Sequence, residues 1–253
     1  MLRLVQIARC GFASGLIALG VIGLVSRNVN LVWGPVPHWI PRSAVLAVIL
    51  ALIPLASGIA ILFRRTAAAA SLAVFAYVLL WWVLVKVPPV LEAPLTELTW
   101  LDCGMYGMLL SGAWTLYADL DGRSSLGGER GTRAARLLFG LGLIPTGLSH
   151  FVYLKFTVPL IPSYFPVPVA WAYFTGACHL AAGLGVLFGV LPGLAARLES
   201  AMLAIFTLLV WVPRVVARPA AGGNWTELWI SWALTAAAAV VAARVTPRTR
   251  QSA

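Results

Sequence analysis

Charged residues are scarce in this sequence: they make up 10% of the 253 residues, whereas a soluble domain has about 25%. The few charges stand in short islands between apolar runs, and the mean hydropathy is +0.92. A helix of roughly 20 apolar residues is long enough to cross a bilayer. One such run fits a soluble helical core, but eight do not. The scarcity of charge therefore predicts an all-α membrane protein.

Cysteine and histidine are also rare, with three residues of each. There is no C-x-x-C pair, and Cys10, Cys103 and Cys178 are predicted at different membrane depths. This disfavours a thiol–disulfide enzyme, which needs two thiols within reach. No histidine, cysteine or acidic cluster has the spacing of metal ligands, so we predict no metal site. No phosphate-binding loop and no Ser/His/Asp set is present, which argues against ATP-driven transport and hydrolysis, and no cofactor is evident.

Positive charge is in excess, with a formal net charge of +10. The arginines form no basic face or nucleic-acid motif, so we predict no nucleic-acid partner. Twelve of the 18 lysine and arginine residues fall on the side of the membrane that holds both termini. By the positive-inside rule this side is cytoplasmic. We predict a multi-pass protein of the bacterial inner membrane.

Eight apolar runs are predicted as transmembrane helices. A polar island rich in glycine and serine separates the first four from the last four, as a linker would. The runs cover about Ala8–Val25, Ala44–Phe63, Ala67–Val87, Leu101–Tyr117, Ala135–Tyr153, Val167–Val190, Ala195–Val212 and Leu228–Val245.

The two halves of the chain resemble each other at a shift of about 125 residues, which is the mark of an internal repeat. Pro37 matches Pro162, and the pair Leu62-Phe63 matches Leu187-Phe188. An even number of helices gives both halves the same orientation, so the repeat is parallel. We predict two parallel four-helix bundles. Their bounds are 1–117 for a diverged first repeat, 118–133 for a cytoplasmic linker, and 134–253 for a second repeat with a basic C-terminal tail.

One set of motifs in the second half is similar to that of the DoxX-like integral membrane proteins. It begins with Gly147 and His150-Phe151, continues through an aromatic loop with two prolines, and ends with Asn224-Trp225 and Glu227. The further matching residues are Pro162, Pro166, Gly176, Gly183, Val212-Pro213 and Arg214. The resemblance implies four-helix bundles, of which some are linked to quinone-coupled sulfur oxidation or to thiol and oxidative-stress complexes. In the first half Ser26 stands near the place of His150, Pro54 near that of His179 and Pro89 at that of Arg214. Because the counterpart of His150 differs, any family site is expected only in the second half.

Six residues of the second half are candidates for ligand binding. His150 is suited to donate a proton or hydrogen bond to a quinone, and His179 is an ionisable group in mid-helix, where such groups are costly and often functional. Arg214 with Glu227 would complete an outer polar pocket. The candidates are His150, Tyr164, His179, Arg214, Trp225 and Glu227. Each also has a plain structural role open to it, as a cap, a lipid anchor or a packed polar group. A second ion pair is expected between Lys86 and Asp102 or Glu97.

A haem between His150 and His179 is disfavoured, because helix rise places them at different depths: roughly 25 Å and 16 Å from the cytoplasmic helix ends.

We expect the second half to bind a quinone or similar lipid-soluble redox molecule, or the chain to be the membrane subunit of an oxidoreductase with a soluble redox partner. The alternatives are a small-molecule permease built from parallel repeats and a structural assembly factor.

Overall fold

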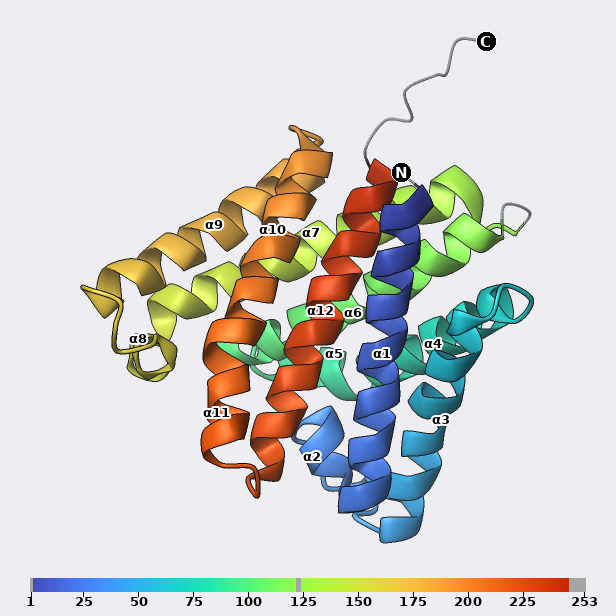
Figure 1. Cartoon of the computed structure of the whole chain (residues 1–253), viewed down its shortest axis with the longest axis horizontal. Coiled ribbons are helices and arrows are strands. Elements are labelled where there is room, and N and C mark those ends of the chain that lie inside the picture. Colours follow the sequence, from blue (N-terminus) through green and yellow to red (C-terminus); the bar gives the residue numbers. More distant parts are fainter. Residues whose placement is uncertain (1, 122–123, 246–253) are drawn as a thin grey trace.

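The computed structural model describes residues 2–121 and 124–245, and these residues form helices without any strand (Figure 1). Seven helical segments among them are long and apolar enough to cross a membrane, as in a multi-pass membrane protein. This confirms the predicted class. The segments are Leu4–Ser26, Ala44–Leu62, Ala67–Glu92, Gly128–Val152, Pro168–Phe188, Pro192–Ala217 and Gly222–Val245. The predicted basic tail lies outside the described residues.

The fourth predicted span differs from these seven. It lies in α6 (Glu97–Leu120), which is long enough to cross but is not among the sufficiently apolar segments. Fourteen of its 24 residues are buried, and they include glycine, serine, threonine and tyrosine. A helix at the centre of a bundle faces other helices instead of lipid, so it does not need an apolar surface all round.

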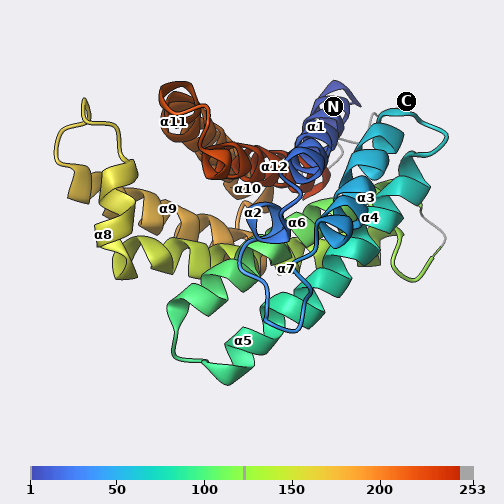
Figure 2. The ribbon, with the colours of Figure 1, turned by 90° about the horizontal axis from the view of Figure 1, so that it is seen from below.

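The long helices form two layers that cross at a steep inclination (Figure 1). One layer has the order α3 (Ala44–Leu62), α1 (Leu2–Ser26), α12 (Gly222–Val245) and α10 (Pro192–Phe206). The other has the order α4 (Ala67–Trp81), α6, α7 (Gly128–Val152) and α9 (Pro168–Phe188). Figure 2 shows α11, α12 and α1 along one side of the molecule, and α9, α7 and α4 along the other.

Each layer contains one helix pair from each half of the chain. The first long helix of each half packs on the last helix of the other half, so that α1 contacts α12 and α7 contacts α6. Contacts between α6 and α12 join the layers at the centre. The arrangement differs from the predicted pair of four-helix bundles in that the interface between the halves is part of the core.

Helix bounds recur at a constant offset along the chain. The helix α4, a π-helical turn over Trp82–Lys86, α5 (Val87–Glu92) and α6 each begin and end 125 residues before their counterparts. The counterparts are α10, a π-helical turn over Thr207–Trp211, α11 (Val212–Ala217) and α12. The indole N–H of Trp100 donates to Pro94 O, and that of Trp225 donates to Pro219 O, both at 2.9 Å.

The two ends of the molecule are built differently. The start of α1, the end of α12 and the α3–α4, α6–α7 and α9–α10 connections lie at one end (Figure 1). The short helices α2 (Val29–Trp33), α5, α8 (Leu154–Thr157) and α11 lie at the other. We refer to the latter as the short-helix end.

Small residues allow the helices to approach closely, and large apolar side chains face outward. Gly11 and Gly15 of α1 face Ala236 and Ala233 of α12, as their four-residue spacing predicts. On α3, Val45 is 70% exposed, as a side chain facing lipid would be. Polar side chains lie inside instead, and two sets of them form the sites described next.

Candidate functional site

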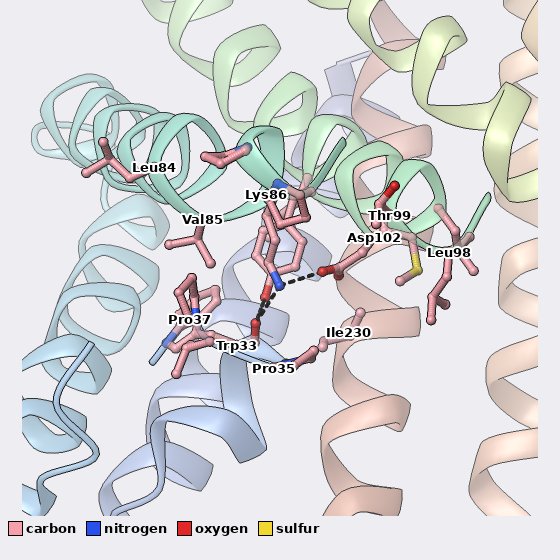
Figure 3. A pocket seen from close by; sticks show the side chains of 18 of the residues that line it. Trp33, Pro35, Pro37, Leu84, Val85, Lys86, Leu98, Thr99, Asp102 and Ile230 are labelled. Atoms are coloured by element: carbon pink, nitrogen blue, oxygen red, sulfur yellow. Dashed lines mark hydrogen bonds and ion pairs between the residues drawn. The ribbon is translucent and has the colours of Figure 1, made fainter. Parts of the chain in front are cut away.

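A cavity of about 670 Å³ opens at the short-helix end of the first half (Figure 3). Its walls come from the loop after α2, from the π-helical turn over Trp82–Lys86 with α5, from the first turns of α6, from α12, and from Leu19 of α1. Most of its lining side chains are apolar or aromatic, including Trp33, Leu109 and Ile230. Its polar members are His38, Lys86, Glu92, Thr99, Asp102, Tyr106 and Glu227.

Lys86 is the central polar group of this cavity. The residue is 2% exposed, and its ammonium lies 2.7 Å from Asp102 Oδ2 and donates to Trp33 O at 3.0 Å. Figure 3 shows the side chain pointing toward both partners. Burying a lone ammonium in a membrane is costly, and this pairing offsets the cost.

A π-helical turn positions Lys86. The turn covers Trp82–Lys86, and α5 follows it with Pro88 and Pro89 as its second and third residues. Because proline has no backbone N–H, it cannot donate a hydrogen bond to the preceding turn. π-helical turns commonly occur where the backbone hydrogen-bond pattern of a helix changes, and at functional sites. The wider turn places Lys86, its last residue, against α2 and α6.

The carbonyl of Trp33 anchors the pair from the other side. It belongs to the last residue of α2, where helix carbonyls have no partner within the helix. Asn28 caps the start of this helix, and Gly34 ends it with a φ of 71°, a conformation that favours glycine. Tyr106 also donates its hydroxyl to Trp33 O, at 2.6 Å, so a lysine and a tyrosine share one backbone acceptor.

The donors and acceptors of the cavity are unequally used. An ammonium has three N–H bonds, and Lys86 uses two of them in hydrogen bonds; its nitrogen also lies over the Tyr106 ring, 4.4 Å from the ring centroid. Asp102 is 30% exposed. A ligand in the cavity thus meets a buried ammonium beside a partly exposed carboxylate, within mostly apolar walls.

The six predicted ligand-binding residues do not gather in one place. Of the six, only Glu227 lines this cavity. Trp225 lines a second, almost wholly apolar hollow between α1 and α12. Tyr164 is 68% exposed, and its ring centroid lies 5.0 Å from that of Phe165.

Arg214 donates to Pro159 O at 2.8 Å and lies 5.8 Å from the Trp211 ring. Among the described residues, no hydrogen bond or ion pair joins it to Glu227 or His150. The first-half pair of Lys86 with Asp102, by contrast, is confirmed.

His150 and His179 do lie together. Their ring centroids are 5.1 Å apart, and both rings pack on Phe206. The depth estimate that separated them is wrong, because α7 is inclined and extends from Gly128. The rings touch each other directly, and no group of three residues within the described ranges is arranged to hold a metal ion.

Glu199 is the partner that the sequence reasoning missed. Its Oε1 lies 2.8 Å from His179 Nδ1, and both residues are 1% exposed. The sequence did contain a signal for it. Glu199 is an acid inside an apolar run, and a short connection joins that run to the helix that carries His179. Trp33 gave no such signal, since every residue has a backbone carbonyl and the sequence does not show which of them accepts a hydrogen bond.

We compared the chain with protein-family models, with curated proteins and with solved structures, and none of them matches it.

Proposed function

We propose that this membrane protein binds a lipid-soluble redox molecule of the quinone class in the cavity beside Lys86. The observation that carries the proposal is the buried ammonium of Lys86, which lines a mostly apolar cavity beside Asp102. A quinone carbonyl is a hydrogen-bond acceptor on an apolar body, which matches this combination of one polar donor with apolar walls.

The size of the cavity supports the same class of ligand. Pockets for small molecules have volumes of about 300–1,000 Å³, and this cavity has about 670 Å³. Proline-rich segments on both sides, Pro35 with Pro37 and Pro88 with Pro89, line it. Proline fixes the backbone, so these walls are already shaped before a ligand binds.

We further propose that the chain is a tandem duplication of a DoxX-like unit in the bacterial inner membrane, with both termini in the cytoplasm. The constant 125-residue offset of helix bounds supports the duplication. The cavity then faces the outer leaflet. Because the offset aligns Lys86 with Trp211 and Tyr106 with Ser231, the ligand site belongs to the first half and uses Glu227 from the second.

A soluble redox protein is the partner expected for such a site, since this chain has no motif for a redox cofactor of its own. At the rim of the cavity, Trp39 and Leu98 are each 56% exposed.

Mass spectrometry of organic extracts from the purified protein tests the proposal. We expect wild type to retain a quinone near stoichiometry, and Lys86→Met to lose it. Thr99→Trp keeps the ion pair but fills the cavity, so it should lose the quinone as well. His150→Ala and the exposed Glu129→Gln should retain it. No enrichment over an unrelated membrane protein would refute the proposal.

A permease is the second candidate, and one observation favours it. Transporters keep buried ionisable groups deep in the membrane, and His179 with Glu199 forms such a pair. Counterflow of a labelled substrate in proteoliposomes, blocked by Glu199→Gln and not by Glu129→Gln, would distinguish a permease from a quinone-binding protein.

A further inference from the structure

The second half contains a buried polar cluster that the quinone proposal does not use. Glu199 of α10, His179 of α9 and His150 of α7 follow one another across three helices. Glu199 and His179 are each 1% exposed, and Glu199 Oε2 has no hydrogen-bond partner among the described residues. An unpaired carboxylate oxygen at such a depth is expensive, so the protonation of the cluster must keep it close to neutral.

The hydrogen bonds of Thr175 determine where His150 carries its proton. The Thr175 hydroxyl lies 2.9 Å from Trp171 O and 3.1 Å from Ala172 O, and both are acceptors only. Its single hydrogen is therefore donated to a carbonyl, and its oxygen accepts from His150 Nδ1 at 2.9 Å. Ala172 O accepts from the same nitrogen at 3.3 Å. Neutral His150 thus has its proton on Nδ1, and its Nε2 is an available base.

His179 has the opposite arrangement. When the acid proton lies between Oε1 and Nδ1, a neutral pair has two forms: a carboxylic acid that donates to Nδ1, or a carboxylate that accepts from an imidazolium. In both forms Nε2 of His179 carries a hydrogen. His179 therefore has a donor nitrogen and His150 an acceptor nitrogen on adjacent rings, whose centroids are 5.1 Å apart at an interplanar angle of 61°, and the described structure has no direct hydrogen bond between the two rings.

We propose that Glu199, His179 and His150 form a proton relay through the second half, independent of the quinone site. In one step, after a rotation of the adjacent rings that brings the two Nε2 atoms within hydrogen-bond distance, the Glu199 proton passes from Oε1 to Nδ1 of His179, while Nε2 of His179 gives its proton to Nε2 of His150. The carboxyl becomes a carboxylate, His179 stays neutral with its proton moved to the other nitrogen, and His150 becomes an imidazolium. No electrons move, and the total number of protons is unchanged.

The surroundings add few charges to this relay. Cys178 is next to His179 on α9, and Arg197 on α10 is exposed. On the side of α12, the Ser231 hydroxyl hydrogen-bonds the hydroxyl of Thr207, the first residue of the π-helical turn after α10, at 2.7 Å. At the 125-residue offset Pro54 and Val74 stand in place of His179 and Glu199, and both are buried in the first half. The same helix packing therefore forms without the polar pair, which indicates that the pair is not a requirement of the fold.

Nitrogen-15 NMR of the full-length protein in lipid nanodiscs tests the relay directly, because the chain has only three histidines. We expect His150 to be protonated at Nδ1 and His179 at Nε2. The two rings should titrate in two coupled steps rather than independently. Glu199→Gln should abolish one of the two steps and alter the titration of His150, which Glu199 does not touch. Glu129→Gln, an exposed acid on α7, is the matched control and should change neither ring.

Thr175→Val provides a second variant that leaves the His179–Glu199 pair intact. It removes the nearer of the two acceptors of His150 Nδ1–H and leaves only Ala172 O, so the preference for the Nδ1 proton should weaken. A purely structural pair would lower stability in Glu199→Gln and leave the His150 titration as in wild type; that result overturns the relay. Wild-type rings that keep one protonation state throughout the range of pH in which the protein is folded would also overturn it.

Discussion

Removing either partner of the Lys86–Asp102 pair should destabilise the protein, but by unequal amounts. At 2.7 Å the gross attraction is about 6 kcal/mol for an effective dielectric constant near 20. Desolvation offsets much of it, so the cost of a substitution depends mainly on the charge that is left behind.

The two surviving charges differ in their access to water. After Asp102→Leu, an ammonium that is 2% exposed keeps the Trp33 carbonyl as its hydrogen-bond acceptor and the Tyr106 ring beside it but has no counter-ion, and we expect a loss of about 3–5 kcal/mol in the free energy of unfolding. After Lys86→Met, the remaining carboxylate is 30% exposed and hydrates through the cavity, so the loss should be about 1–3 kcal/mol. The double variant leaves no charge and should lie within about 1 kcal/mol of wild type.

Reversible unfolding in mixed detergent micelles, or steric trapping in bicelles, measures these free energies. Glu129→Gln is the control for loss of an acid and should be neutral. The reasoning fails if Lys86→Met costs as much as Asp102→Leu, or if the double variant costs the sum of the single variants.

Tyr106→Phe removes one of the two donors to Trp33 O and should cost about 1 kcal/mol in unfolding free energy, with quinone retention unchanged. Gly112→Val should cost about 1–3 kcal/mol in unfolding free energy, since a Cβ there lies 2.6 Å from Ala237 Cβ between the two layers. Gly223→Ala is the control: a Cβ there has no atom within 4 Å, so the variant should cost well under that in the same assay. Separately expressed halves, divided between α6 and α7, should be unstable alone and assemble when co-expressed, because α1 packs on α12 and α6 on α7. Co-purification of the two halves tests this, and a stable, monodisperse single half would contradict it.

The sequence predicted helices well where the prediction depended on the length of an apolar run and on proline. A run such as Ala44–Phe63 indicates a membrane-spanning helix, and α3 over Ala44–Leu62 agrees with it within one residue. Polar residues in the linker misled the prediction of helix ends, since α6 extends to Leu120 and α7 begins at Gly128. Helix-forming residues continue a helix beyond the membrane, where hydropathy gives no signal.

The candidate site was less predictable, for a geometric reason. Distance along a helix does not give depth when helices are inclined, and so His150 and His179 appeared separate although their rings touch. The pair of Lys86 and Asp102 was predictable, because both stand at helix ends joined by a short connection. A cavity that combines Trp33, Lys86 and Glu227 was not, since it depends on how α12 packs against the first half.

The low hydropathy of α6 has a consequence for how the protein enters the membrane. A charged residue costs about 2.5–3.5 kcal/mol at a helix centre on the insertion scale, and α6, which has Glu97 and Asp102 in its first two turns, lacks the apolar excess that offsets even a part of such costs. Its Asp102 faces the ammonium at the end of the preceding span, so the two charges neutralise each other only when both helices are in place. We expect α4 and α6 to leave the translocation machinery together as a hairpin, and a chain truncated after α6 with Lys86→Met to leave α6 uninserted.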